Sequence, residues 1–136
     1  MTTDSLNFFH SVKKMNKLRS PNVLLMSGFI QYLKNPFKKI SSIIKDGKFE
    51  YIILDRVFFL KDINLKTLIS IQYADSKIYD SSYPSYLFNY KSFVNEFYNL
   101  NFDMISEWVY FDQTPGISNY SKGFVFKKII IGLNKI

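Results

Sequence analysis

The sequence predicts a single α/β domain in which one β-sheet is flanked by helices. Two observations predict it. Residues 22–60 read as strand, helix, strand, and residues 91–136 read as a helix followed by two further strands. The length of 136 residues suits one domain with one core. The apolar content of 47% is typical of a globular chain and argues against disorder.

Residues 1–20 predict an N-terminal helix. Ser5 is a candidate N-cap, and Pro21 ends the helical pattern. The expected apolar face consists of Phe8, Phe9, Val12, Met15 and Leu18. His10 is placed on the polar flank of this helix, where a solvated or capping role is expected instead of catalysis.

Residues 22–60 predict a β-α-β unit. The run "NVLLM" is continuously apolar, as in a strand that is covered on both faces. Asn35 and Pro36 predict an N-cap followed by proline at the first helical position, and Gly47 predicts a left-handed helix stop. The second strand is "YIILDRVFFL". Two strands joined by a helix are expected to be parallel with a right-handed crossover.

Residues 61–90 lack a clear periodicity and predict a long aromatic loop. The stretch "LISIQY" within it can form a short strand. A connection of this length in a compact domain is usually a lid or a binding loop.

Residues 91–136 predict a helix and two antiparallel strands. Asn89 or Ser92 caps the helix, whose sequence is "YKSFVNEFYNL". The strands "FDMISEWVYFD" and "GFVFKKIIIGL" are joined by "QTPGISNYSKG", which is too short to contain a crossover helix. These two strands are therefore expected to be neighbours in the sheet.

The composition excludes several classes of site. The chain contains no Cys and only one His, so we expect no metal site and neither a Cys nucleophile nor a Ser-His-Asp triad. No apolar run reaches the roughly 20 residues of a membrane span, and residues 1–10 lack the pattern of a secretory leader. We therefore expect a cytoplasmic protein with no membrane partner.

The formal net charge of +7 has two interpretations. Only Arg19 and Arg56 among the 18 basic residues are Arg, although Arg dominates bidentate recognition of phosphate and guanine. The chain is also rich in the residues with AT-rich codons. This favours genome composition as the source of the charge over binding to a polyanion, so nucleic acid is not the expected partner.

Four segments, in order, resemble one bacterial family. They are "LLMSGFIQYLKNPFKKISSII", "IILDR", "QYADSKIYDSSYP" and "KGFVFKK". They resemble the C-terminal half of class I S-adenosylmethionine-dependent methyltransferases, and the similarity spans roughly Phe8 to Lys128. The resemblance implies a Rossmann-like half-sheet with the strand order 4-5-7-6, in which the last strand is antiparallel. On this mapping "NVLLM" corresponds to strand four and "YIILDRV" to strand five.

The sequence departs from that family in one major respect. None of its five Gly forms the G-x-G pattern of the cofactor loop, and the acidic residue expected to hold the ribose is absent too. We therefore expect a truncated or split methyltransferase-like protein, inactive alone, that binds S-adenosylmethionine weakly or not at all. The strand at 23–26 is expected to present an unpaired edge, covered by a second copy or by a separate N-terminal half-domain chain.

The resemblance implies cofactor contacts after the first strand. Ser27, Gly28, Gln31 and Tyr32 would lie at the carboxyl edge of the sheet, near the methionine side of the cofactor or the substrate. The alternative is a tight turn with a hydrogen-bonded Ser and a Tyr packed on the helix. Both interpretations fit the sequence.

Asp55 and Arg56 end the second apolar segment at the same edge. Asp55 is the candidate general base and Arg56 the candidate partner of an anionic substrate group. An ion pair at a strand end is the alternative. The candidate substrate wall, for a small molecule or a glycan, is Gln72, Tyr73, Tyr79 and Tyr83. The alternative for these residues is a loop that buries its own aromatic rings, and Trp108 is expected in the core.

Two further functions stay open at this point. One is a non-catalytic module that uses half of the fold for oligomerisation. The other is a basic nucleic-acid-binding domain, which only the aromatic and Lys residues of 73–91 support.

Overall fold

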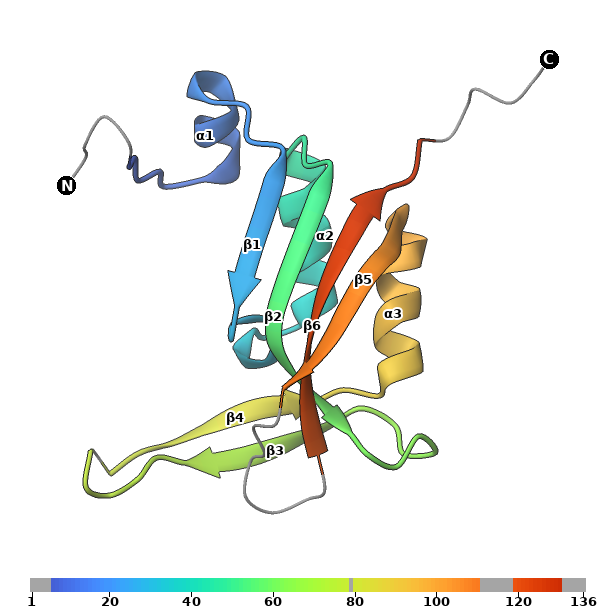
Figure 1. Ribbon diagram of the computed structural model, residues 1–136. Coiled ribbons are helices and arrows are strands. Elements are labelled where there is room, and N and C mark those ends of the chain that lie inside the picture. Colours follow the sequence, from blue (N-terminus) through green and yellow to red (C-terminus); the bar gives the residue numbers. More distant parts are fainter. Residues whose placement is uncertain (1–5, 79, 111–118, 131–136) are drawn as a thin grey trace.

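The computed structural model describes residues 6–78, 80–110 and 119–130 (Figure 1). The helices are α1 (Val12–Leu18), the short 3-10 turn η1 (Ile30–Tyr32), α2 (Pro36–Asp46) and α3 (Tyr90–Asn99). The strands are β1 (Val23–Ser27), β2 (Tyr51–Leu60), β3 (Leu68–Tyr73), β4 (Ser82–Leu87), β5 (Phe102–Tyr110) and β6 (Asn119–Lys128).

Four strands form the main sheet in the order β1-β2-β6-β5. β1 and β2 are parallel, whereas β6 is inserted antiparallel between β2 and β5. This is the predicted order 4-5-7-6, so the fold class expected from the sequence is confirmed. The parallel pair is joined by α2, and β5 and β6 are antiparallel neighbours, as the short connection between them required.

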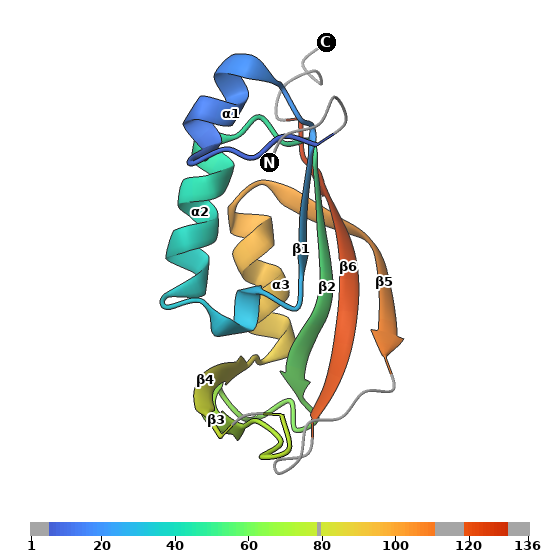
Figure 2. The same cartoon turned by 90° about the vertical axis from the view of Figure 1, so that its left-hand side faces the viewer.

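Both long helices cover the same face of the sheet (Figure 2). The side chains that point to this face include Leu54 of β2 and its register partner Phe124 of β6, and both are fully buried. Phe93 and Phe97 of α3 complete the core from above the sheet, and their rings contact those of Phe124 and Phe126. Edge-to-face and offset contacts between these rings add to the stabilisation from burial.

The opposite face of the sheet has no helix over it among the described residues (Figure 2). Leu25, Ile53 and Val125 lie side by side on this face in consecutive strands. Leu25 is 64% exposed, although side chains of this type are normally buried. The prediction that β1 is covered on both faces is therefore wrong for the part of the chain that the structure describes, because α2 and α3 pack on one side only.

The N-terminal helix is shorter than predicted. α1 begins at Val12, and the Ser11 side chain accepts a hydrogen bond from the Lys14 N–H; the predicted cap Ser5 lies outside the described residues. None of the residues of α1 is buried, and Phe8 and Leu18 are exposed. The predicted apolar face does not form a core contact, because α1 meets the rest of the molecule mainly at the end of α2.

The ends of α2 confirm one prediction and correct another. Pro36 stands at the start of the helix as expected, and Asn35 precedes it in the left-handed region at φ 53° without a side-chain cap bond. Gly47 has φ −98°, so the predicted left-handed stop is wrong. Glycine is required there for space, since a Cβ would lie 2.0 Å from the ring of Phe49. At α3, Asn89 is the cap and accepts from the Ser92 N–H.

Residues 61–90 contain an antiparallel hairpin of β3 and β4 instead of an irregular loop throughout. The stretch "LISIQY" forms β3, and its partner β4 contains Pro84, which the sequence placed in the loop. Proline is tolerated because this small sheet has only two strands, so both are edges. The hairpin is anchored to the main sheet by two backbone bonds between Phe88 and the strand end at Phe58 and Leu60.

Candidate functional site

The candidate site begins where β1 ends beside the middle of β2, so Asp55 and Arg56 lie inside a strand that continues to Leu60 and not at a strand end as the sequence predicted. Ser27 and Asp55 are register partners there, and the Ser27 hydroxyl donates to the Asp55 carboxylate at 2.9 Å. The N–H of Gly28 donates to the Asp55 carbonyl oxygen at 2.8 Å. Gly28 has φ +54°, and a Cβ built on it would meet nothing within 4 Å. The turn thus places open space directly beside the carboxylate.

The Asp55 carboxylate has a second donor. The hydroxyl of Tyr110 donates to its other oxygen, so Ser27 and Tyr110 hold the carboxylate from two sides. Arg56 follows in a bulge of β2 with φ 54°, and its guanidinium lies 5.9 Å from the centre of the Tyr110 ring. Among the described residues Asp55 and Arg56 do not form the ion pair that was the alternative interpretation.

Gln31 lies beneath this edge and is only 1% exposed. Its amide nitrogen donates to the Arg56 carbonyl oxygen at 3.0 Å, which ties η1 to the bulge. Its amide oxygen is buried with no hydrogen-bond partner among the described residues. A buried acceptor without a donor is uncommon and costs free energy, so a ligand donor would be favoured here.

Tyr32 and Tyr83 form an aromatic wall at the same edge. Their ring centres are 5.5 Å apart in an edge-to-face arrangement, and with Pro84 they line an open hollow of about 350 Å³. Burial raises the pKa of the Tyr32 hydroxyl, the Gln31 side chain opposes this by hydrogen bonding, and the neighbouring Tyr83 adds to the rise. Tyr32 therefore stays protonated at neutral pH and is available as a donor.

The other residues of the predicted substrate wall lie on different faces of the β3–β4 hairpin or outside the described residues. Gln72 is the register partner of Tyr83 and so shares its face. Tyr73 points to the opposite face and is 80% exposed, whereas Tyr79 lies outside the described residues. The structure thus brings together Ser27, Gly28, Gln31, Tyr32, Asp55, Arg56 and Tyr83, with Gln72 adjacent.

Sequence reasoning missed Tyr110. Its side chain comes from β5 and crosses β6 to reach β2, over Gly123 and beside Trp108. A Cβ at Gly123 would lie 2.1 Å from the Trp108 ring, so the indole packs flat on the sheet at the glycine. Strand alternation could have placed Trp108 and Tyr110 on one face, but it could not have named the carboxylate that Tyr110 meets.

A second polar cluster lies on the helix side of the sheet, away from this edge. Glu107 accepts a hydrogen bond from the Tyr90 hydroxyl at 2.7 Å and pairs with Lys122 at 2.8 Å. The Lys122 ammonium lies 4.7 Å from the centre of the Tyr90 ring. Burial and the acceptor Glu107 raise the pKa of Tyr90 to about 12. Burial alone would raise the pKa of Glu107, but the bonds from Lys122 and Tyr90 hold it below its ordinary value.

The described residues contain neither a metal-binding group nor a membrane-spanning helix. No group of three or more His, Asp or Glu side chains is placed to bind a metal ion. No described helix combines the length and the apolar character needed to cross a bilayer.

The strand order, the inserted antiparallel strand and the polar edge define a methyltransferase-like α/β fold. A solved structure of a SAM-dependent methyltransferase from Methanosarcina mazei shares this fold, with a TM-score of 0.55 and 16% sequence identity. The match covers 82% of this chain and 60% of the archaeal one. The chain thus spans about 60% of the length of this structural neighbour.

No protein-family model matches the sequence, and the search of curated proteins found no match either. At 16% identity the structural match shows the fold and leaves the activity to be argued from the residues of the site.

Proposed function

We propose that this chain is a methyltransferase-like unit that contributes the substrate side and the methionine side of a site for S-adenosylmethionine. The observation that carries the proposal is the Asp55 carboxylate, held by Ser27 and Tyr110 at the carboxyl edge of the sheet. The hollow at Tyr32 and Tyr83 lies at the same edge. In open α/β sheets ligands bind at this edge.

The residues present fit one part of that cofactor. Gly28 leaves space beside the backbone, Gln31 offers a buried acceptor without a donor, and the Tyr32 ring can face a sulfonium cation. These groups suit the amino-acid end of the cofactor. The sequence has no G-x-G loop to hold the nucleoside end, so the proposed unit is truncated or split and inactive alone.

When bound, the cofactor supplies an electrophilic methyl group, and the residues of the chain provide the rest. Asp55 is proposed as the base that takes the proton of the methyl acceptor, and its two donors hold the carboxylate in one orientation. Arg56 is proposed to contact an anionic group of a small-molecule or glycan acceptor. Tyr83 and Gln72 form the wall that positions this acceptor, and positioning provides much of the rate in group transfer.

Titration calorimetry with S-adenosylmethionine tests this assignment. The isolated chain is expected to bind weakly, with a Kd of about 1 mM or higher. Gly28→Val would remove even this binding, because a β-branched side chain at positive φ is strained and fills the open space. Ser20→Val, at an exposed position before the opposite end of β1, is the control. A micromolar Kd for the wild type would contradict the proposal that the chain holds only part of the cofactor. Weak binding that is unchanged by Gly28→Val would contradict the placement of the cofactor beside Gly28.

The partner proposed from the sequence would cover the outer edge of β1. β1 pairs only with β2 among the described strands, and Val23 and Leu25 beside this edge are exposed. The strand carries neither charge nor proline, which are the usual protections of an edge. We propose that a strand of a second copy, or of a separate N-terminal chain, pairs here.

Solution mass measurement separates these partners. A homodimer is expected if a second copy pairs at the edge, and Leu25→Lys would return it to a monomer by placing a charge there. Ile63→Lys, at an exposed position away from the edge, is the control. A wild-type chain that stays monomeric at high concentration would exclude the homodimer and leave the separate chain as the partner to seek.

A further inference from the structure

The positive charge of the chain is confined to one part of the molecule. Residues 6–49 contain nine Lys and Arg and a single acid, Asp46, which is a net charge of +8. Residues 50–136 contain nine basic and nine acidic residues, which is a net charge of zero. A bias in codon usage alone would not separate the charges in this way. The distribution therefore calls for a reason in the structure.

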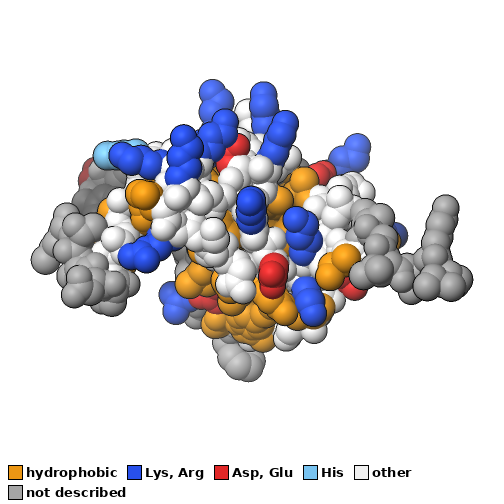
Figure 3. Space-filling model, turned by 90° about the horizontal axis from the view of Figure 1, so that it is seen from above, with side chains coloured by type: hydrophobic (Ala, Val, Ile, Leu, Met, Phe, Trp, Pro, Cys, Tyr) orange, Lys and Arg blue, Asp and Glu red, His pale blue; other side chains and the backbone are white. Residues whose placement is uncertain are grey.

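The charged segment forms one continuous surface of α1 and α2. The Asn16 side chain of α1 donates to the Asp46 carbonyl oxygen at the end of α2, at 2.6 Å. Lys13 lies 3.7 Å from the Asp46 carboxylate, so the single acid of the segment is already paired. Figure 3 shows Lys and Arg side chains gathered on the helix side of the molecule, at the upper edge of the view. The hydrophobic side chains gather at the opposite edge.

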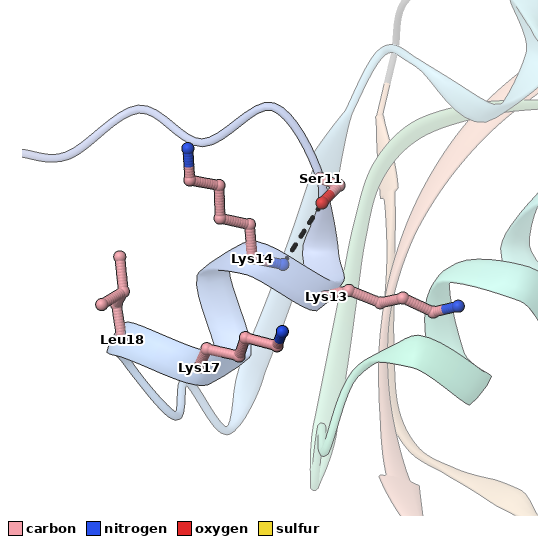
Figure 4. Close-up of a pocket in the computed structure, with 5 residues that line it drawn as sticks. All are labelled: Ser11, Lys13, Lys14, Lys17 and Leu18. Carbon is pink, nitrogen blue, oxygen red and sulfur yellow. Dashed lines mark hydrogen bonds between the residues drawn. The ribbon is translucent and has the colours of Figure 1, made fainter.

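The surface has two hollows lined by lysines, one on α1 and one along the first half of α2. One has a volume of about 490 Å³ and is lined by Ser11, Lys13, Lys14, Lys17 and Leu18. Figure 4 shows its three lysines spreading from α1, with Lys13 directed toward α2. The other, of about 340 Å³, is lined by Lys34, Asn35, Lys38, Lys39 and Ser42.

The outer face of α2 continues from the second hollow with polar side chains. Lys38, Ser41, Ser42 and Lys45 are exposed along it, while Phe37, Ile40 and Ile44 of the same helix belong to the core or pack against it. The small serines leave room for a backbone to approach, and their hydroxyls can donate to phosphate oxygens. The positive end of the helix dipole adds to the potential near Lys38 and Lys39.

We propose that the α1–α2 surface binds the phosphodiester backbone of a nucleic acid, without reading its bases. Lysines act as flexible point charges, which suits a repeated array of phosphates better than one fixed phosphate group. The 11 residues of α2 extend over roughly 16 Å, which is the length of about five stacked nucleotides of a strand at 3.4 Å each. An anionic membrane fits less well at α2, whose outer face exposes polar side chains, but α1 also exposes Leu18 beside its lysines, so binding to vesicles is one outcome of the test. This inference does not depend on methyl transfer.

Fluorescence anisotropy with a labelled 20-nucleotide single strand tests the proposal. The chain is expected to bind at 50 mM salt, and the logarithm of its affinity should fall linearly with that of the salt concentration. If about four phosphates are neutralised, the slope is about −3. A mixed-sequence strand and a homopolymer should bind within about threefold of each other, since only the backbone is contacted.

A pair of triple variants locates the surface. Lys38→Gln, Lys39→Gln and Lys45→Gln together should weaken binding at least about tenfold and reduce the salt slope by about 2. The matched control changes Lys61, Lys66 and Lys77 to Gln, which removes the same charge from exposed positions in the hairpin region. This control should change affinity by less than about threefold. Gln and Lys have similar helix propensities, and thermal unfolding monitored by circular dichroism confirms that each variant is folded.

Three outcomes would overturn the proposal. The first is an absence of salt-dependent binding to the strand. The second is an equal loss of affinity in the two triple variants, which would mean that binding depends on the net charge of the chain and not on the α1–α2 surface. The third is stronger binding to vesicles of one quarter anionic phospholipid than to the strand, which would assign the surface to a membrane.

Discussion

The two faces of the main sheet are built from the same strands but have opposite surroundings. Toward the helices, the side chains of β2 and β6 are fully buried under the rings of α3. On the other side, Leu25, Ile53 and Val125 form an apolar row that no described helix covers. The covered face therefore provides the folding core, and the open face is an apolar surface of the kind that marks an interaction site. Apolar side chains in these strands therefore serve two purposes, which are to form the folding core and to provide an exposed surface for interaction.

The largest expected effect is the difference in stability between a truncated side chain on the covered face and one on the open face. Phe93→Ala should lower the free energy of unfolding by about 3–5 kcal/mol, because the ring is fully buried among five others. Leu25→Ala removes a side chain that is 64% exposed and should cost under about 1 kcal/mol in the monomer. Urea denaturation measures both values. Equal losses would mean that the open face is covered in solution.

A smaller effect is expected at the packed end of the open face. Gly123→Ala places a Cβ against the Trp108 ring and should cost about 1–3 kcal/mol. Because Trp108 is the single Trp of the chain, its fluorescence should report the displaced ring directly. Gly28→Ala, where a Cβ meets nothing, is the comparison and should leave this fluorescence unchanged. An unshifted spectrum in Gly123→Ala would show that the indole does not lie on the glycine.

A pH-dependent effect is expected at the helix-side cluster. The pKa of Tyr90 is raised to about 12 in the folded chain, so its contribution to stability is complete below about pH 10 and is lost as the pH rises toward 12. Tyr90→Phe removes the bond to Glu107, should cost about 1 kcal/mol at neutral pH and should flatten the alkaline part of the profile. Thermal unfolding between pH 7 and pH 11 measures this.

The same cluster predicts a change in acid. The pKa of Glu107 is lowered in the folded chain. Its contribution to stability is therefore complete when the pH is above the ordinary pKa of Glu, and it is lost as the pH falls through the lowered pKa. Lys122→Met removes the charge and keeps the bulk of the side chain. The acid loss of stability between pH 5 and pH 3 should then become smaller than in the wild type. A wild-type profile that is flat in this range would contradict the ion pair.

Much of the fold could be predicted, for identifiable reasons. Apolar runs and caps located β1, β2, α2 and α3, and the resemblance to methyltransferases supplied the strand order. The hairpin partner β4 was missed because Pro84 reads as a loop residue, although an edge strand tolerates it. Gly47 was assigned a left-handed conformation from its position after a helix, whereas its actual constraint is the Phe49 ring packed against it.

Part of the candidate site could also be predicted from the sequence, and part could not. Ser27 ends β1 and Asp55 lies in β2, two strands that the sequence predicts to be parallel, so their proximity followed from the register. Tyr110 lies 55 positions beyond Asp55, and no local pattern connects the two residues. Tyr32 and Tyr83 meet only because the hairpin folds back onto η1.

By itself the sequence determined the strand and helix segments, the polar edge at Ser27 and Asp55, and the lack of a Gly-rich cofactor loop. These are local properties, since periodicity, capping and turn chemistry act over a few neighbouring residues. Only the tertiary structure decided that both helices cover one face, that Tyr110 holds the carboxylate and that the lysines of α1 and α2 form one surface. Such features depend on how distant segments pack, because burial and charge act between residues that are close in space and far apart in the chain.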